Sequence, residues 1–166
     1  MSEVLIDVSL AAQQLTLYQA AEGGNIVLHR FPVSTARNGA GEQEGSFCTP
    51  RGAHRIAQKI GDGAPRFAVF SAREATGEIW TPQLEAADPG RDWILSRILW
   101  LDGLEPGRNQ GGNVDSHARY IYIHGTNEED KIGTPVSHGC IRMRNDDVVA
   151  LFDLVSVDTR VNIRED

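Results

Sequence analysis

The chain has 166 residues, 40% of them hydrophobic, which suffices for one core and predicts a single domain over residues 1–166. Its formal net charge is −7 at pH 7. Nucleic-acid affinity depends largely on basic surfaces, so nucleic acid is not an expected partner. A membrane is not expected either, because Glu3, Asp7, Gln13 and Gln14 interrupt the apolar residues of the N-terminal region.

The N-terminal region also lacks the basic segment followed by an apolar segment that is typical of a secretory signal peptide. We therefore expect a cytoplasmic location. The two cysteines, Cys48 and Cys140, are expected to stay reduced because disulfides are rare in that compartment.

Short β-favouring runs separated by Gly, Pro and Asn predict strands along most of the chain. The expected strands cover residues 4–8, 15–18, 26–33, 66–71, 78–80 and 161–163, with another beginning at Ala53. Residues 22–25 predict the turn of a hairpin. Residues 92–101 are apolar at too many positions for their period to distinguish a strand from a helix.

One helix is expected, directly after Cys140. Asn145 is predicted to cap it, with acidic residues in the first turn near the positive end of the helix dipole. Apolar residues at helical spacing should face the core, namely Val148, Leu151, Phe152 and Val155. Residues 37–46 and 103–116 are expected to be loops, and the second either forms the rim of a cleft or lies in solvent.

The stretch over residues 120–143 carries the residues with the most chemistry. A strand is expected to end in His124-Gly125-Thr126, with Tyr120, Tyr122 and His124 on one face. A polar loop then leads to Ser137-His138-Gly139-Cys140. A nucleophilic cysteine needs a neighbouring base, because a free thiol is mostly protonated at pH 7. His124 and His138 are both candidates, and backbone N–H groups next to Gly139 could stabilise an oxyanion.

Other assignments of these residues fit less well. His124, His138 and Cys140 are all potential zinc ligands, but no fourth ligand stands at a familiar spacing, so we expect no metal and no other cofactor. No GxSxG motif is present, and Ser137 is interpreted as a local hydrogen-bonding residue. Cys48 is interpreted as a small buried residue.

Basic residues cluster near this stretch although the chain is acidic. Arg119 and Arg142 are candidates for binding a substrate carboxylate, since a guanidinium can bind a carboxylate through two parallel hydrogen bonds. The alternative is that they are ordinary solvated charges.

Tyr122-Ile123-His124-Gly125-Thr126 and Ser137-His138-Gly139-Cys140-Ile141-Arg142 together resemble the signature of the L,D-transpeptidase (YkuD-type) catalytic domain. Weaker resemblances are Phe31-Pro32-Val33-Ser34, Thr49-Pro50-Arg51-Gly52 and residues 159–163, so the similarity extends over nearly the whole chain. The resemblance implies a mainly β fold, a β-sandwich of this catalytic-domain type with one short helix after the cysteine.

The resemblance also implies a thioester mechanism on peptidoglycan stem peptides or muropeptides. Cys140 would be the nucleophile and His124 its base, oriented by the Gly125 carbonyl, while His138 would shape the site. The Gly139 and Cys140 amides would form the oxyanion hole. Tyr122, Ser137, Arg119 and Arg142 are the candidates for substrate binding, and carbapenems would acylate the same sulfur.

The expected cytoplasmic location favours water as the acceptor, because recycled tetrapeptides rather than polymeric peptidoglycan are found there. The prediction is therefore an L,D-carboxypeptidase of cell-wall recycling that cleaves the meso-diaminopimelate–D-Ala bond. The alternatives are an L,D-transpeptidase that forms 3-3 cross-links or attaches other amines, and a module that binds stem peptides without turnover.

Overall fold

The computed structural model describes residues 3–166, which form a mainly β structure with two α-helices. The strands are β1 (Val4–Ser9), β2 (Gln14–Gln19), β3 (Ile26–Ser34), β4 (Gly52–Ile60), β5 (Ala68–Ser71), β6 (Glu74–Ile79), β7 (Ile94–Gly103), β8 (Tyr122–Gly125), β9 (Ile141–Met143) and β10 (Arg160–Arg164). The helices are α1 (Pro82–Ala87) and α2 (Asn145–Leu154), and short 3-10 helices cover Gly112–Val114 and Glu129–Lys131. The predicted mainly β class is confirmed.

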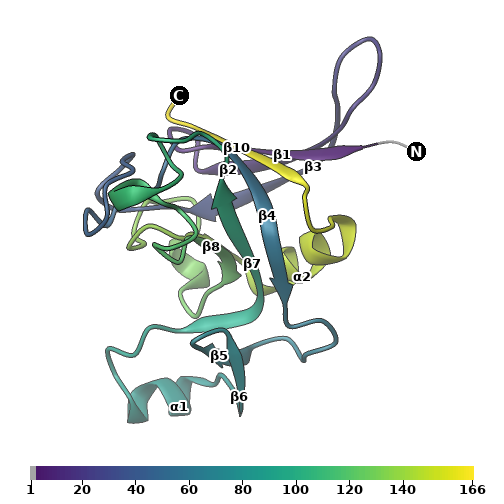
Figure 1. Ribbon diagram of the computed structural model, residues 1–166. Helices are drawn as coiled ribbons and strands as arrows, with labels where there is room; N and C mark the ends of the chain where they lie inside the picture. The colour runs from purple at the N-terminus through teal and green to yellow at the C-terminus, as the bar shows by residue number, and fades with distance from the viewer. Residues whose placement is uncertain (1–2) are drawn as a thin grey trace.

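The strands pair in the order β4, β10, β1, β2, β3, β9, β8 and β7, and β7 also pairs with β4. This closed set of pairings is folded into two layers, in which β10, β1, β2 and β3 cross over β4, β7 and β8 (Figure 1). The β5–β6 hairpin extends from β7 and lies beside α1. The predicted sandwich is thus one continuous sheet that covers both sides of its core.

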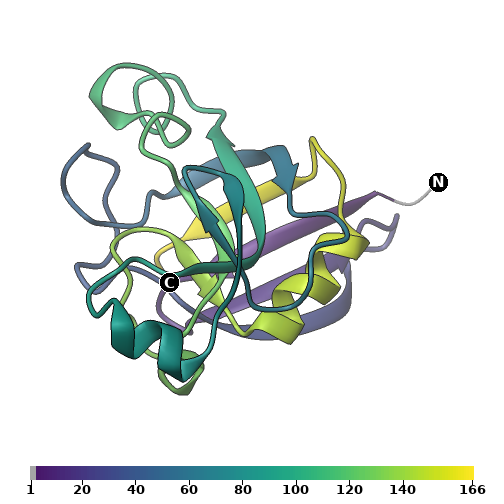
Figure 2. The same ribbon diagram turned by 90° about the horizontal axis from the view of Figure 1, so that it is seen from below.

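The main core lies between these layers. It contains apolar side chains from both, including Ile6, Leu17, Ile56, Leu99, Ile123 and Met143. Seen from below, α2 lies along the sheet while α1 lies to one side (Figure 2). Val148, Leu151, Phe152 and Val155 all belong to the core, which confirms the face predicted for α2.

Residues 92–101, whose period was ambiguous, mostly belong to strand β7. This strand pairs with β4, β5 and β8 along its length, and most of its residues are buried. A strand covered on both faces has no reason to alternate apolar and polar residues, so its sequence is nearly continuously apolar.

Helix α1 was not predicted. Its sequence signals are nevertheless present, because the Thr81 hydroxyl accepts a hydrogen bond from the Leu84 N–H at 3.1 Å and Pro82 occupies the first turn. The helix follows directly after the predicted strand at residues 78–80. That strand in fact runs from Glu74 to Ile79 and pairs with β5.

The predicted cap of α2 is wrong. Asn145 is the first helical residue and is fully buried, and the N-cap is Arg144 without a side-chain hydrogen bond. The Asn145 N–H instead donates to the Glu129 carboxylate at 2.7 Å, which supplies the negative group at this helix end. Asn145 is buried because its amide group connects neighbouring segments near the candidate site.

Two smaller expectations also need correction. Cys48 is partly exposed rather than buried, and its Sγ contacts the carbonyl oxygens of Asn38 and Ser46. Tyr120 lies outside β8 and adopts a φ of +58°, so it is not a strand residue although it lines the same cavity as Tyr122 and His124.

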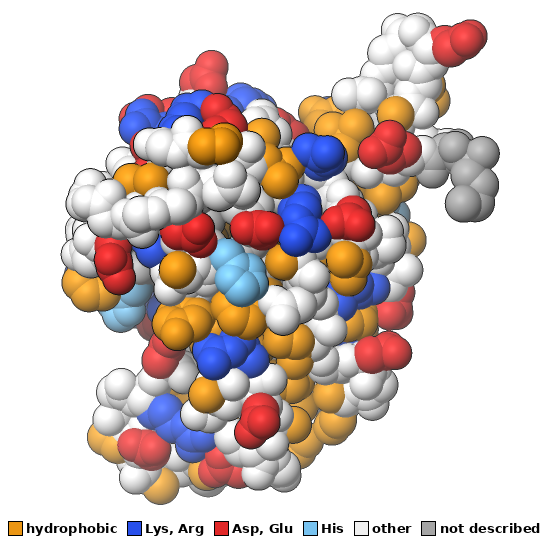
Figure 3. Space-filling model, viewed as in Figure 1, with side chains coloured by type: hydrophobic (Ala, Val, Ile, Leu, Met, Phe, Trp, Pro, Cys, Tyr) orange, Lys and Arg blue, Asp and Glu red, His pale blue; other side chains and the backbone are white. Residues whose placement is uncertain are grey.

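The surface carries charges of both signs. On the face shown in Figure 3, acidic and basic side chains are interspersed, and basic groups lie next to an apolar strip with a histidine near the centre. Among the described residues 3–166, no helix is both long and apolar enough to cross a bilayer.

Candidate active site

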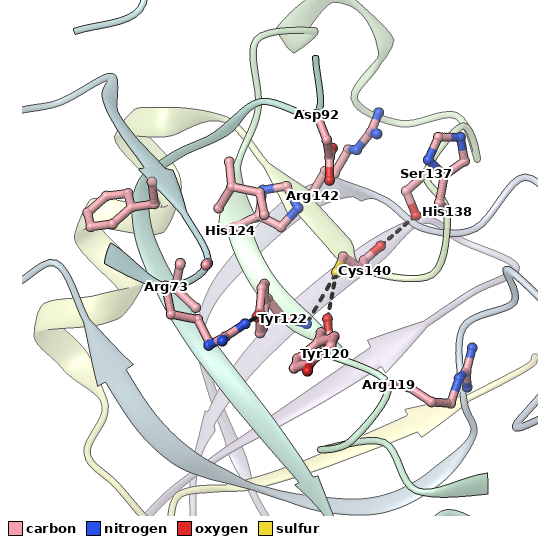
Figure 4. Close-up of a pocket in the computed structure, with 14 residues that line it drawn as sticks. Arg73, Asp92, Arg119, Tyr120, Tyr122, His124, Ser137, His138, Cys140 and Arg142 are labelled. Carbon is pink, nitrogen blue, oxygen red and sulfur yellow. Dashed lines mark hydrogen bonds between the residues drawn. The ribbon is translucent and has the colours of Figure 1, made fainter. Parts of the chain in front are cut away.

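Strands β8 and β9 bring the two halves of the motif together. They pair in parallel, with His124 opposite Arg142 and Gly125 opposite Met143. Cys140 directly precedes β9, so this register places it beside β8 although a polar loop separates the two segments in sequence. A cavity of about 320 Å³ opens here, and its lining includes Arg73, Asp92, Tyr122, His124, Cys140 and Arg142 (Figure 4).

The Cys140 thiol is held by backbone groups at and just before the start of β8. Its Sγ lies 3.3 Å from the Tyr120 carbonyl, which accepts the S–H, and 3.3 Å from the Tyr122 N–H, which donates to sulfur. Burial raises the pKa of Cys140 to about 11, and the Tyr122 N–H opposes that shift. The group is therefore a neutral thiol at pH 7.

His124 is only 2% exposed, and its ring is oriented by the backbone. Its Nδ1 lies 2.7 Å from the Gly125 carbonyl oxygen. A carbonyl can only accept, so Nδ1 carries the proton and Nε2 is left as the base. Burial lowers the pKa of His124 to about 4, which keeps the imidazole neutral.

Gly125 is required by its close contacts. A Cβ at this position would lie 2.4 Å from Asn145 Oδ1 and 2.6 Å from the Leu95 carbonyl oxygen. The Asn145 amide also accepts from the Ser96 hydroxyl at 2.6 Å and donates to the Thr126 carbonyl at 2.8 Å. Asn145 thus fixes the end of β8 that carries both His124 and the carbonyl that orients it.

The loop before Cys140 is closed by internal hydrogen bonds. The Ser137 hydroxyl donates to the Cys140 carbonyl at 2.6 Å and accepts from the Gly139 N–H at 3.2 Å. Thr49 donates to the Gly139 carbonyl at 2.9 Å. Gly139 has a φ of +131°, which residues with a side chain rarely adopt.

The two amides predicted for the oxyanion hole differ in their hydrogen bonds. The Gly139 N–H is already used by Ser137, whereas the Cys140 N–H has no protein acceptor within residues 3–166. One of the two expected amide donors is therefore available to a substrate.

His138 lies at the rim rather than at the sulfur. It is exposed, and its ring makes an edge contact with Phe47 at a centroid distance of 5.8 Å. Figure 4 places it beyond Ser137, away from the Cys140 sulfur. Of the two histidines that the sequence offered as a base, His124 is the one with a fixed orientation inside the cavity.

The sequence pattern of the L,D-transpeptidase catalytic domain (YkuD) matches residues 3–163. The chain belongs to this family.

Curated relatives carry the same name. The chain is 60% identical over 107 residues to the probable L,D-transpeptidase ErfK/SrfK of Salmonella typhimurium, a match covering 57% of this chain and 35% of that protein. It is 50% identical over 94 residues to the probable L,D-transpeptidase YbiS of Escherichia coli, covering 49% of this chain and 31% of that protein. The chain thus spans about a third of the length of these two relatives.

Solved structures show the same fold. An L,D-transpeptidase from Mycobacterium smegmatis superposes with a TM-score of 0.59 and 23% identity, over 98% of this chain and 59% of that one. L,D-transpeptidase 3 from Mycobacterium tuberculosis, in complex with a faropenem-derived adduct, gives a TM-score of 0.57 at 17% identity, over 99% of this chain and 61% of that one. The predicted L,D-transpeptidase type of β fold is confirmed.

The two predicted substrate arginines of this L,D-transpeptidase domain are engaged by protein groups. Arg119 is half-buried and donates to the carbonyls of Gly41, Glu42 and Cys48, the last at 2.7 Å. Arg142 pairs with Glu128 at 3.2 Å. Arg119 therefore holds the loop over residues 41–48 against the site, while Arg142 lines the cavity as part of an ion pair.

Sequence reasoning missed four residues around the site: Thr49, Arg73, Asp92 and Asn145. Thr49 and Asn145 hold the segments that carry Gly139 and Gly125, respectively. Arg73 follows β5 and Asp92 precedes β7, so the two residues are distant in sequence from each other and from Cys140. The tertiary structure brings both to the cavity. The TPxG turn was the one available signal, since it contains Thr49.

No group of three or more His, Cys, Asp or Glu side chains within residues 3–166 is arranged to hold a metal ion. Cys48 and Cys140 are both free thiols.

Proposed function

We propose that this domain catalyses acyl transfer through a Cys140 thioester, with peptidoglycan stem tetrapeptides as donors. The observation that carries the proposal is that a thiol and a neutral imidazole line one cavity. The imidazole Nδ1 is bonded to the Gly125 carbonyl, and its Nε2 has no hydrogen-bond partner within residues 3–166. Membership of the L,D-transpeptidase family supports the choice of donor.

In the proposed first step, Cys140 Sγ attacks the carbonyl of meso-diaminopimelate at its L-centre while the thiol proton passes to His124 Nε2. The thiol must first turn from the Tyr120 carbonyl, which it contacts at 3.3 Å. The Cys140 N–H stabilises the oxyanion, a single donor of this kind contributing roughly 3 to 4 kcal/mol. His124 then protonates the departing D-Ala amine, which leaves a thioester.

The second step decides the product. Water activated by His124 would hydrolyse the thioester to the tripeptide, which makes the domain an L,D-carboxypeptidase, as the sequence predicts for a cytoplasmic enzyme of cell-wall recycling. Location in the cytoplasm stays a prediction, which fractionation of cells that produce the native protein would test.

Transfer to an amine is the second candidate, and one observation favours it. Cys140 also lines a second, smaller hollow of about 250 Å³, together with Phe47, Ile121, Arg119 and His138, and the last two line the larger cavity as well. A second peptide entering there would reach the thioester without displacing the donor from the larger cavity. The product would be a 3-3 cross-link.

A product assay on a defined tetrapeptide, with and without a peptide amine acceptor, tests both candidates. We expect loss of D-Ala by the wild-type protein and no loss by Cys140→Ala. Tripeptide as the main product with acceptor present supports hydrolysis, whereas cross-linked dimer supports transfer. Absence of both products would contradict the proposed acyl transfer.

Carbapenem treatment separates an enzyme from a module that only binds peptides. Two of the similar structures are described as an imipenem complex and a faropenem-derived adduct. We expect a single covalent adduct on Cys140 by peptide mass spectrometry, with Cys48→Ala labelled like the wild type. An unmodified Cys140 would indicate a binding module.

A further inference from the structure

Arg73 stands at the tip of the β5–β6 hairpin and reaches into the cavity that contains Cys140 (Figure 4). Ala72 and Arg73 have φ values of +48° and +67°. Two successive positive φ values are those of the tight turn that best suits a two-residue hairpin, although Gly and Asn usually occupy it. The conformation costs backbone energy and directs the Arg73 side chain towards β7 and β8.

The Arg73 guanidinium is held over an aromatic surface. Its Cζ lies 5.1 Å from the Trp100 ring centre and 4.9 Å from that of Tyr120. One of its N–H groups donates to the Tyr122 hydroxyl at 3.1 Å. Aromatic rings orient a guanidinium without neutralising its charge. Binding an anion there therefore costs little free energy for ordering the Arg73 side chain.

Arg73 has no ion-pair partner within residues 3–166, and the acidic Glu74 beside it acts on its charge only through space. The other two arginines of the cavity differ, because Arg142 pairs with Glu128 and Arg119 donates to three carbonyls. Arg73 thus lines the cavity without an ion pair among the described residues and keeps N–H donors that its bond to Tyr122 does not use.

The Tyr122 hydroxyl adds a second donor. It accepts from Arg73 and donates to no group within residues 3–166, so its proton is free for an acceptor in the cavity. The backbone N–H of the same residue contacts Cys140 Sγ at 3.3 Å. One tyrosine therefore connects the reacting sulfur at its backbone with the cation at its hydroxyl.

We infer that Arg73, together with the Tyr122 hydroxyl, binds a carboxylate of the donor stem peptide and so determines specificity for an anionic donor. This inference rests on the proposed function. Two donor carboxylates are in question: that of the terminal D-Ala, one residue beyond the scissile carbonyl at about 3.5 Å per residue, and that of the diaminopimelate side chain. Both present the same planar acceptor to a guanidinium.

The test compares three tetrapeptides: the native one, one with a C-terminal amide, and one with Lys in place of diaminopimelate, which lacks the side-chain carboxylate. The variants are Arg73→Gln, Arg73→Lys and the control Arg66→Gln. Arg66 is an exposed arginine whose ion pair with Asp146 lies outside the cavity. The readout is kcat/KM for D-Ala or D-Ala-amide release by each protein on each peptide.

We expect Arg73→Gln to lower kcat/KM on the native peptide about 10- to 100-fold, mainly through KM, with Arg73→Lys in between. The loss should vanish on whichever modified peptide lacks the carboxylate that Arg73 binds, and Arg66→Gln should match the wild type. An equal loss on all three peptides would mean that Arg73 only holds the hairpin and would overturn the inference, as would no loss at all. If the wild type cleaves none of the peptides, the proposed function itself fails.

Discussion

Cys140 Sγ and His124 face the same cavity, but the sulfur is hydrogen-bonded to Tyr120 and Tyr122 rather than to the imidazole. Burial keeps both groups neutral, with the pKa of His124 lowered to about 4 and that of Cys140 raised to about 11. The resting site is therefore a thiol next to a base and not a thiolate–imidazolium pair. Proton transfer has to accompany the attack on the substrate.

This resting state predicts a flat pH profile for acylation. His124 is deprotonated above about pH 4 and Cys140 is protonated below about pH 11, so the active form dominates between these values. We expect the second-order rate of carbapenem acylation to vary by less than about threefold between about pH 5.5 and pH 9. Stopped-flow fluorescence would measure it. An acidic limb with a pKa near that of a free imidazole would contradict the lowered pKa of His124, whereas a basic limb within this range would argue for a preformed ion pair.

Gly125→Ala is predicted to destabilise the fold and to reduce activity. The new methyl group would overlap Asn145 Oδ1 and the Leu95 carbonyl, both of which are closely packed. Overpacking of this kind costs about 1 to 3 kcal/mol of unfolding free energy. Urea unfolding and carbapenem acylation would be measured together. Gly23→Ala is the matched control, since a Cβ there contacts nothing within 4 Å, and equal stability of the two variants would contradict the prediction.

Thr49→Val is predicted to slow acylation. The Thr49 hydroxyl accepts from the Ala36 N–H at 3.0 Å and donates to the Gly139 carbonyl at 2.9 Å, and valine keeps the shape but makes neither bond. A buried N–H without an acceptor costs about 1 to 3 kcal/mol. The loop before Cys140 should loosen, which the acylation rate and hydrogen exchange at Gly139 would detect. Thr134→Val, at an exposed hydroxyl, should leave both unchanged.

Buried neutral histidines predict a loss of stability in acid. Burial lowers the pKa of His54, as of His124, to about 4. The unfolded chain, with a histidine pKa near 6.5, binds more protons than the folded chain between these values. The unfolding free energy should therefore fall as pH drops from about 6.5 to about 4, with a slope of up to about 1.4 kcal/mol per pH unit for each histidine.

Urea denaturation at several pH values would measure this slope. His54→Gln should reduce the slope, because it removes one of the two buried histidines. His54 lies away from the cavity, and its ring is held by Ser116 and the Gly52 carbonyl. His117→Gln is the control, since that ring is partly exposed. A slope unchanged by His54→Gln would show that His54 is not the group responsible.

Much of the fold and of the reacting pair follows from local sequence. The β-favouring runs at 15–18 and 26–33, with the turn between them, were sufficient for the β2–β3 hairpin. The spacing of Val148, Leu151, Phe152 and Val155 was sufficient for the buried face of α2. The HGT and SHGC motifs were enough to select the family and to bring Cys140 and His124 into one hypothesis, because residue type and spacing are what a motif records.

Long-range packing determined the rest. The parallel register of β8 and β9 places His124 inside the cavity and leaves His138 on the rim. The Gly139 N–H donates to the Ser137 hydroxyl, and Asn145 packs on Gly125 instead of capping its helix. Arg73 enters the cavity from a hairpin far earlier in the chain. Each of these contacts either joins segments that are distant in sequence or depends on a particular backbone angle. Local residue patterns specify neither the long-range contacts nor these angles.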